Sequence, residues 1–313
     1  MRVCALAGGV GGAKLAAGLQ EALSPGELTV VVNTADDFDL WSLRICPDLD
    51  TVMYTLVGIA NPETGWGIRD ETFSALGMLS RYGEETWFRV GDRDLATNVL
   101  RTRLLREGER LTEVALRLSG SLGVPGRLLP MCDEPVSTVL HTPAGTLEFQ
   151  EYFVRRGQRD EVLGVELRGI RESRMTGEVE ETLFSTEAVV LCPSNPVVSI
   201  GPILAVPGMR RVLAETSVPC VAVSPIVGGR ALKGPADRMM ASLGREPSAA
   251  GVAREYKGIV DGMVIDHADE QEREEIEALG MRVLVTDAVM RSEPDRTRLA
   301  REVLGFCEEL RQA

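Results

Sequence analysis

The stretch that decides the fold is "RVCALAGGVGGAKLAAGLQEALSPGELTVVVNTADD", residues 2–37. It begins with a short apolar run at 2–7 and passes through glycines into a helix-like segment at 13–23. A β-rich run then follows at 28–33. A strand, a glycine-rich turn, a helix and a second strand form a βαβ unit, which implies a parallel sheet. The sequence therefore predicts an α/β fold.

The same alternation returns in the last third of the chain. Strand-like runs lie at 188–192, 218–224, 262–266 and 281–286. Helix-like segments lie at 235–244, 269–280 and 295–312. The middle third differs, because 69–122 has the pattern of several helices and 136–154 that of an antiparallel hairpin.

We find no linker, repeat or low-complexity tract, so we expect a single domain over residues 1–313. Its core is a Rossmann-like, three-layer parallel sheet built from about 1–60 and 185–313. The range of about 61–184 then forms an inserted cap of helices and a β-hairpin. A length of 313 residues with 44% hydrophobic residues is ample for such a core.

The composition limits the partners and the compartment. A net charge of −13 disfavours binding to nucleic acid, because the chain repels a polyphosphate backbone. No apolar run approaches the ~20 residues of a membrane span, and the sequence begins directly with a strand pattern. The six cysteines include no C-x-x-C pair, so we interpret them as core thiols of a cytoplasmic protein.

The glycine run "GGVGGAK" at 8–14 lies between the first strand and the first helix. Glycines at this point let backbone N–H groups approach a phosphate at a helix N-terminus, with Lys14 as a point charge. The spacing fits neither the dinucleotide-binding G-x-G-x-x-G pattern nor the P-loop. A tight turn without a ligand is the alternative interpretation.

Acidic residues follow the second strand, in "NTADD" at 33–37 and "CPDLD" at 46–50. Ligands of open α/β sheets bind at the carboxyl ends of strands. Carboxylates beside a phosphate loop would repel the ligand unless a hard cation lay between them, so Asp36 and Asp37 favour Mg²⁺. We expect Asp48 to be a plain N-cap and Asp50, in the first helical turn, to be functional.

Three further stretches carry polar side chains at predicted loop positions. Arg89, Asp92, Arg93 and Asp94 precede a helix, where a surface ion-pair cluster with an aspartate cap explains them. Ser194 and Asn195 lie between two prolines and suit hydrogen bonding to a base or phosphate, although a strand-to-helix turn explains them equally well. The third stretch supplies positive charge and turn glycines, through Gly228, Gly229, Arg230 and Lys233.

Nine motifs in order carry a resemblance that spans nearly the whole chain: "GGVGGAK", "NTADD", "CPDLDTVMYTL", "WGIRDET", "GDRDLAT", "LLPMCDEPVST", "PSNPVVSIGPIL", "VSPIVGGRALKGPAD" and "DRTRLA". Together they resemble the 2-phospho-L-lactate transferase family of coenzyme F-420 biosynthesis. Cys132 and Glu134 depart from the family pattern, which has serine and aspartate at these positions.

The resemblance implies a reaction. The donor is a guanosine diphosphate that carries lactate or enolpyruvate, and the acceptor is the deazaflavin FO (7,8-didemethyl-8-hydroxy-5-deazariboflavin). The terminal ribityl hydroxyl of FO attacks the phosphate next to the three-carbon acid, and GMP leaves. The resemblance also implies Mg²⁺ as cofactor and a homodimer. No motif distinguishes a lactate donor from an enolpyruvate donor.

Site roles follow from joining the resemblance to the motifs. Asp36, Asp37 and Asp50 are the expected metal ligands, and Asp37 and Asp50 the expected catalytic residues. Asp50 and Arg89 are expected to contact FO. The expected donor-binding residues are Gly9, Gly11, Gly12, Lys14, Asn33, Ser194, Asn195, Gly228, Gly229 and Arg230.

Two other functions share the βαβ opening. One is an NAD-dependent oxidoreductase, which the missing third glycine of the dinucleotide pattern disfavours. The other is a non-catalytic regulator of the same fold that binds nucleotide sugars. Transfer to FO with release of GMP would distinguish the transferase from both.

Overall fold

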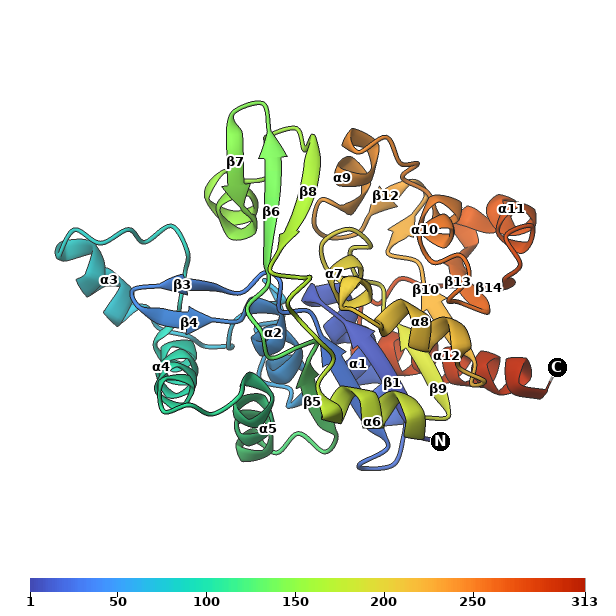
Figure 1. The fold of residues 1–313 in the computed structure, drawn as a ribbon, viewed down its shortest axis with the longest axis horizontal. Helices are drawn as coiled ribbons and strands as arrows, with labels where there is room; N and C mark the ends of the chain where they lie inside the picture. The colour runs from blue at the N-terminus through green and yellow to red at the C-terminus, as the bar shows by residue number, and fades with distance from the viewer. Residues whose placement is uncertain (313) are drawn as a thin grey trace.

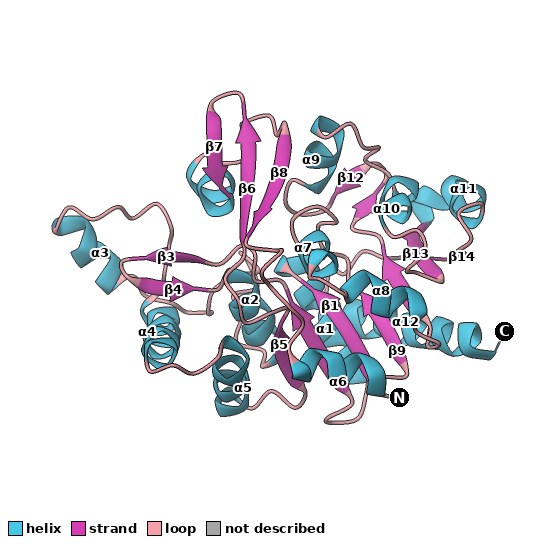
Figure 2. Cartoon of the chain, viewed as in Figure 1, coloured by secondary structure: helices cyan, strands magenta, loops and turns pink. Residues whose placement is uncertain are grey.

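The computed structural model describes residues 1–312. Its centre is a sheet of seven parallel strands in the order β14-β13-β10-β9-β1-β2-β5 (Figures 1 and 2). The strands are β1 (Val3–Ala7), β2 (Leu28–Val32), β5 (Arg127–Pro130), β9 (Ala188–Leu191), β10 (Cys220–Val223), β13 (Gly262–Asp266) and β14 (Arg282–Thr286). The predicted α/β fold with a parallel sheet is confirmed.

The sheet is buried on both faces, so its strands are apolar throughout. Along β1, Cys4 and Leu6 point into one hydrophobic core, and Val3, Ala5 and Ala7 point into the other. The second core is closed by α1 (Gly9–Ala22), α2 (Pro47–Leu56), α5 (Leu111–Leu122) and α12 (Glu293–Gln312). The first is closed by α6 (Gly177–Ser185), α7 (Ile200–Ala205), α8 (Met209–Glu215), α9 (Ala236–Ser242) and α10 (Ala249–Glu255).

The strand order reverses beside β1, which positions the site. The chain runs from β1 through β2 to β5 on one side, and from β9 through β10 and β13 to β14 on the other. The helices that follow β1 and β9, α1 and α7, therefore cover opposite faces of the sheet. A crevice at such a switch point is where open α/β sheets bind their ligands.

The cap stands over this edge (Figure 1). It contains a three-stranded antiparallel sheet in the order β7-β6-β8 and the helices α3 (Ser74–Arg81) and α4 (Asp92–Arg106). The strands are β6 (Ser137–Thr142), β7 (Gly145–Glu148) and β8 (Gly164–Arg168). A small hairpin of β3 (Phe38–Leu40) and β4 (Leu43–Ile45) extends toward α3.

Three local expectations need correction. The hairpin predicted to reach residue 154 ends at β7 and continues as a π-helical turn, η1 (Glu151–Arg155). Phe149 and Tyr152 are both buried, and their spacing of three suits a helix rather than a strand. The predicted helix at 269–280 is a 3₁₀ helix, η2 (His267–Glu272), followed by α11 (Arg273–Glu277).

The range of about 61–184, expected to form only a cap, also supplies β5 to the edge of the main sheet. Within residues 1–312, no helix is long and apolar enough to cross a bilayer.

Candidate active site

A cavity of about 810 Å³ opens at the carboxyl edge of the main sheet. Gly8, Pro193, Ser224 and Ala288 line it, and they follow β1, β9, β10 and β14 closely. We call the part within residues 8–14, 193–199 and 288–291 the glycine end. The part within residues 50–54, 66–67, 87–94 and 149–154, which is largely cap, is the aromatic end.

The glycine end begins where β1 turns into α1. The amide of Gly8 donates to Ser194 Oγ over 3.1 Å, and the amide of Gly9 donates to Asp48 Oδ1 over 2.8 Å. A Cβ on Gly11 would lie 2.3 Å from the carbonyl oxygen of Pro193, which leaves room only for glycine. The loops after β1 and β9 therefore touch through backbone.

Asp48 is the acid that fixes this loop. Its Oδ2 accepts from the side-chain amide of Asn33 over 3.0 Å, while its Oδ1 accepts from Gly9. Burial raises the pKa of Asp48 to about 6, and these two hydrogen bonds oppose the rise. Asn33 is fully buried and does not line the cavity, so it acts through Asp48.

Asp36 lies beside Asp48 and also lines the cavity. Burial, and then the charge of Asp48, raises the pKa of Asp36 well above its usual range. Asp36 Oδ1 is buried without a hydrogen-bond partner. Two adjacent buried carboxylates with a spare oxygen atom are suited to hold a cation or a proton.

Positive charge also gathers around the cavity, which Lys14 and Lys233 line. Burial, and then the charges of Arg296 and Lys233, lowers the pKa of Lys14, so the three cations lie close together. The ammonium of Lys14 donates to the carbonyl of Met290 over 3.0 Å. Such a cluster beside a helix N-terminus favours an anionic ligand.

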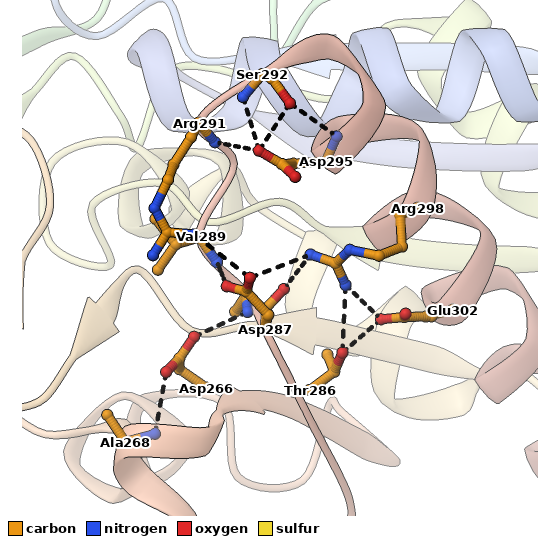
Figure 3. Close-up of polar contacts among 11 residues, drawn as sticks. Asp266, Ala268, Thr286, Asp287, Val289, Arg291, Ser292, Asp295, Arg298 and Glu302 are labelled. Carbon is orange, nitrogen blue, oxygen red and sulfur yellow. Dashed lines mark hydrogen bonds and ion pairs between the residues drawn. The ribbon is translucent and has the colours of Figure 1, made fainter.

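The wall at 288–291 is held by a polar network (Figure 3). Asp266, at the end of β13, accepts from the amide of Ala288 over 2.9 Å and from the amide of Ala268 over 3.0 Å. Arg298 of α12 donates to the carbonyl of Asp287. The wall is thus tied to the neighbouring strand and helix.

Residues 224–225 and 232–236 form a second wall, on either side of the hairpin of β11 (Ile226–Val227) and β12 (Arg230–Ala231), which does not line the cavity. Gly228 and Gly229 form its turn in the left-handed region, with φ of +58° and +74°. The fully buried Asp269 accepts from the amide of Gly228 over 2.8 Å. Beyond the hairpin, Lys233 donates to the carbonyl of Thr64 and lines the cavity.

At the aromatic end, Asp50 lies in the first turn of α2. It forms an ion pair with Arg101 of α4, whose side chain is 2% exposed. Burial raises the pKa of Asp50, and the guanidinium of Arg101 opposes that rise. Arg101 also donates to Asn98 Oδ1 over 2.7 Å, which fixes the guanidinium in place.

Six aromatic side chains line the cavity, although aromatic residues make up only 4% of the chain. They are Tyr54, Trp66, Trp87, Phe88, Phe149 and Phe153. Phe149 and Phe153 stack with ring centroids 5.3 Å apart. Arg89 lines the same end and places its guanidinium 4.3 Å from the ring centroid of Phe73. This surface suits a flat conjugated ring.

The family model for the 2-phospho-L-lactate transferase CofD matches residues 3–303. The chain belongs to the CofD family. The resemblance carried by the nine sequence motifs is therefore confirmed.

Relatives of this chain carry two different names. A phosphoenolpyruvate transferase from Streptomyces griseus is 43% identical, over 99% of this chain and 100% of the relative. A 2-phospho-L-lactate transferase from Methanosarcina acetivorans is 40% identical, over 96% of this chain and 97% of the relative. Overall identity therefore does not choose between the two donors.

Among solved structures, a UPF0052-family protein from Bacillus halodurans superimposes with a TM-score of 0.63. The match covers 97% of this chain and 98% of the other, at 15% identity. This likeness supports the fold of the chain and nothing further.

The cavity brings together part of the predicted donor set. Gly9, Gly11, Lys14, Ser194 and Asn195 line it. Five predicted residues do not: Gly12, Asn33, Gly228, Gly229 and Arg230. Gly12 packs against Ser194, the glycines at 228 and 229 shape a turn, and Arg230 is exposed. Lys233 reaches the cavity from that stretch instead.

Of the predicted metal ligands, Asp36 and Asp50 line the cavity and Asp37 does not. Burial raises the pKa of Asp37 to about 7, and Arg44, with Nη2 3.7 Å from Asp37 Oδ2, opposes the rise. Within residues 1–312, no three His, Cys, Asp or Glu side chains lie close enough together to hold a metal ion. The three predicted acids therefore do not form one cluster.

Two interpretations of acidic residues are wrong. Asp48 is not the N-cap of α2, because Pro47 takes the first helical position and Cys46 the cap. Asp92 does not belong to a surface ion-pair cluster, because its carboxylate accepts from the amides of Ser74 and Ala75 at the start of α3. Pro47 is the sequence signal here: proline favours the first helical position, so Asp48 lies inside the helix and cannot be its cap.

Proposed function

We propose that this chain transfers a phospholactyl or phosphoenolpyruvyl group from a guanosine diphosphate donor to the terminal ribityl hydroxyl of FO, in coenzyme F-420 biosynthesis. GMP is the leaving group. The observation that carries the proposal is one cavity with two chemically different ends, of which one suits phosphates and the other a flat ring. Its volume of about 810 Å³ is in the range of sites for small molecules.

The glycine end is the proposed donor site. Lys14 and Lys233 supply charge for the diphosphate. The amides of Gly8 and Gly9 are used by Ser194 and Asp48, so backbone donors would come from Val10 and Gly11 in the first turn of α1. Asn195 Nδ2 is a buried donor with no partner, and Asn195 lines the cavity. A phosphate or guanine oxygen would satisfy it.

The aromatic end is the proposed acceptor site. The deazaflavin ring of FO would lie against Trp87, Phe88 and Phe153, with Arg89 over its face or on its ring oxygens. Asp50, held by Arg101, would orient the ribityl hydroxyl toward the donor phosphate. Positioning of this kind is the main task in phosphoryl transfer.

We propose Mg²⁺ as the cofactor, held by Asp36 and Asp48 together with donor oxygens. The spare buried oxygen of Asp36, and the repulsion that raises its pKa, fit a hard cation that takes one or two carboxylates. When bound, the ion would neutralise the diphosphate and polarise the attacked phosphorus. Asp37, behind Arg44, would act on the fold around the site.

Mass spectrometry tests the proposal directly. The purified protein is incubated with FO, Mg²⁺ and equal amounts of lactyl and enolpyruvyl guanosine diphosphate. We expect GMP and one phosphodiester of FO, and the mass of that product identifies the preferred donor. Absence of any FO adduct with either donor would refute the proposed function.

We also propose a homodimer. No residue of α3 is buried, and Met78 in this helix and the adjacent Tyr82 are 43% and 76% exposed. An uncovered apolar helix face suits a contact between copies. Light scattering coupled to size-exclusion chromatography should give twice the chain mass of 34.0 kDa, and a monomer mass would refute the dimer.

A further inference from the structure

The proposed transfer needs a group that removes a proton from the attacking hydroxyl. Four ionisable acids line the cavity, namely Asp36, Asp48, Asp50 and Asp94, and no histidine does. Both oxygens of Asp48 accept hydrogen bonds from the chain itself, and Asp50 is in an ion pair with Arg101. Asp36 lies beside Asp48 at the glycine end. Only Asp94 lies at the aromatic end without an ion pair.

Asp94 is fixed in place but keeps one carboxylate oxygen available. It lies in the first turn of α4, and its Oδ1 is 2.8 Å from the hydroxyl of Tyr54, which donates to it. That hydroxyl also lies 2.8 Å from Thr97 Oγ1, so Tyr54 is held from both sides. Within residues 1–312, no group donates to Asp94 Oδ2. Tyr54 thus holds one carboxylate oxygen of Asp94, a residue that lines the cavity, and leaves the second oxygen without a hydrogen-bond donor.

The charges around Asp94 suit a base. Burial, and then the charge of Asp50, raises the pKa of Asp94 to about 7; the hydrogen bond from Tyr54 and the charge of Arg101 lower it, and Glu71 raises it. A base with a pKa near the working pH is the most effective. Arg101 touches Asp50 directly, so the two neighbouring acids differ in their environment. Such a contrast is how active sites separate an orienting carboxylate from a proton acceptor.

We propose that Asp94 is the catalytic base of the acceptor site. As the oxygen of the hydroxyl forms its bond to the phosphorus next to the three-carbon acid, its proton moves to Asp94 Oδ2. The bond from that phosphorus to the bridging oxygen breaks, and GMP leaves with the electron pair. This inference rests on the proposed function and adds a residue to it.

The first test compares Asp94→Asn with the wild-type protein, using FO and the guanosine diphosphate donor that mass spectrometry identifies. We expect kcat to fall by on the order of 10²–10⁴, because the amide cannot accept the proton. The Kd for FO, by its fluorescence, and for GMP, by calorimetry, should change less than about threefold, since neither contact is lost. Asp70→Asn is the matched control, because it removes the same charge from an exposed residue that does not line the cavity.

The second test uses the pH profile and a variant that keeps Asp94. Wild-type kcat/KM should rise with pH through about 7. Tyr54→Phe removes a hydrogen bond that lowers the pKa of Asp94, so the rise should move to higher pH. A role in folding alone would not shift this profile.

The outcomes separate the two proposals. If Asp94→Asn transfers at the wild-type rate with the same pH profile, or if Tyr54→Phe leaves the profile in place, Asp94 is not the base and the proposed function stands. If the wild-type protein forms no FO adduct, the proposed function and this inference fail together.

Discussion

The glycine end of the cavity is built around a tight backbone approach with a few polar side chains, whereas the aromatic end presents large ring side chains. The amides of Gly8 and Gly9 are tied to Ser194 and Asp48, and the tight approach of Gly11 to Pro193 leaves no room for adjustment. Trp66, by contrast, is 45% exposed and is carried on a loop of the cap.

The difference explains how one cavity can recognise both a diphosphate and a conjugated ring. A diphosphate is recognised by charge and by amide groups, which a rigid switch point of a parallel sheet provides at low entropic cost. A conjugated ring is recognised by area, which apolar side chains provide and can adjust to. We therefore expect small changes to be severe at the glycine end and milder at the aromatic end.

The largest effect should come from the proposed metal site. Asp36→Asn should lower kcat by on the order of 10³, because several kcal/mol of charge stabilisation is lost. The fold should persist, since Asp36 Oδ1 has no partner in the chain. Steady-state kinetics with EDTA and restored Mg²⁺ measures the effect.

Asp37→Asn is the comparison variant for this experiment, because Asp37 does not line the cavity. We expect it to lower kcat less than about tenfold. If Asp37→Asn proved the more damaging of the two, the assignment of the metal to Asp36 and Asp48 would be wrong.

The next effect concerns space at the glycine end. Gly11→Ala should weaken GMP binding by about 3 kcal/mol, roughly a hundredfold, because the new Cβ meets a backbone oxygen 2.3 Å away. Calorimetry with GMP measures this loss. Gly305→Ala in α12 is the control, since no atom lies within 4 Å of its new Cβ. Equal GMP affinity in both variants would contradict a rigid glycine end.

The third test compares one variant at each end of the cavity. Arg89→Ala should raise KM for FO, by an amount that corresponds to about 1–3 kcal/mol of lost contact energy. The same variant should leave GMP binding unchanged. Lys14→Ala should weaken GMP binding by about tenfold and leave FO binding unchanged. FO fluorescence and GMP calorimetry on both variants give four numbers. A loss of both ligands in either variant would show that the two ends are not separate.

The sequence predicted the glycine end better than the aromatic end for a physical reason. The sheet, the switch point and the glycine loop depend on local patterns, and apolar runs followed by glycine identify them directly. Lys14, Ser194 and Asn195, which these patterns indicate, line the cavity. Gly228 and Gly229 do not line the cavity, because the same glycine pattern also forms a simple turn, and here Asp269, far along the chain, anchors that turn.

The aromatic end depends on contacts between distant segments. Asp50 meets Arg101 across two helices, and Tyr54 meets Asp94 across the same two helices. No spacing in the sequence encodes these pairs, so the sequence alone predicts a cap or surface position for Asp94. The resemblance to the family supplied Asp50 and Arg89, and only the fold brought Asp94 to them.

The smallest expected effect is on stability, and it concerns the buried acids in the cavity and behind it. The pKa values of Asp37, Asp48 and Asp94 rise to about 7, 6 and 7, so the folded chain holds protons near pH 5 that the unfolded chain has released. Stability should therefore fall as pH rises from 5 to 8. Scanning fluorimetry should show a Tm that falls by roughly 2 °C for each kcal/mol of unfolding free energy lost.

Ligand binding should show which end of the cavity contributes to this loss of stability. Mg²⁺ with GMP should flatten the pH slope by stabilising Asp36 and Asp48 in their charged forms, and FO alone should not. Asp37→Asn should also flatten it, because a neutral side chain removes one buried charge. Asp39→Asn removes the same charge from a side chain that is 74% exposed and should leave the slope unchanged. A Tm that rises from pH 5 to 8 in the ligand-free protein would show that these carboxylates are ionised without penalty, and the cavity would then need no cation to balance them.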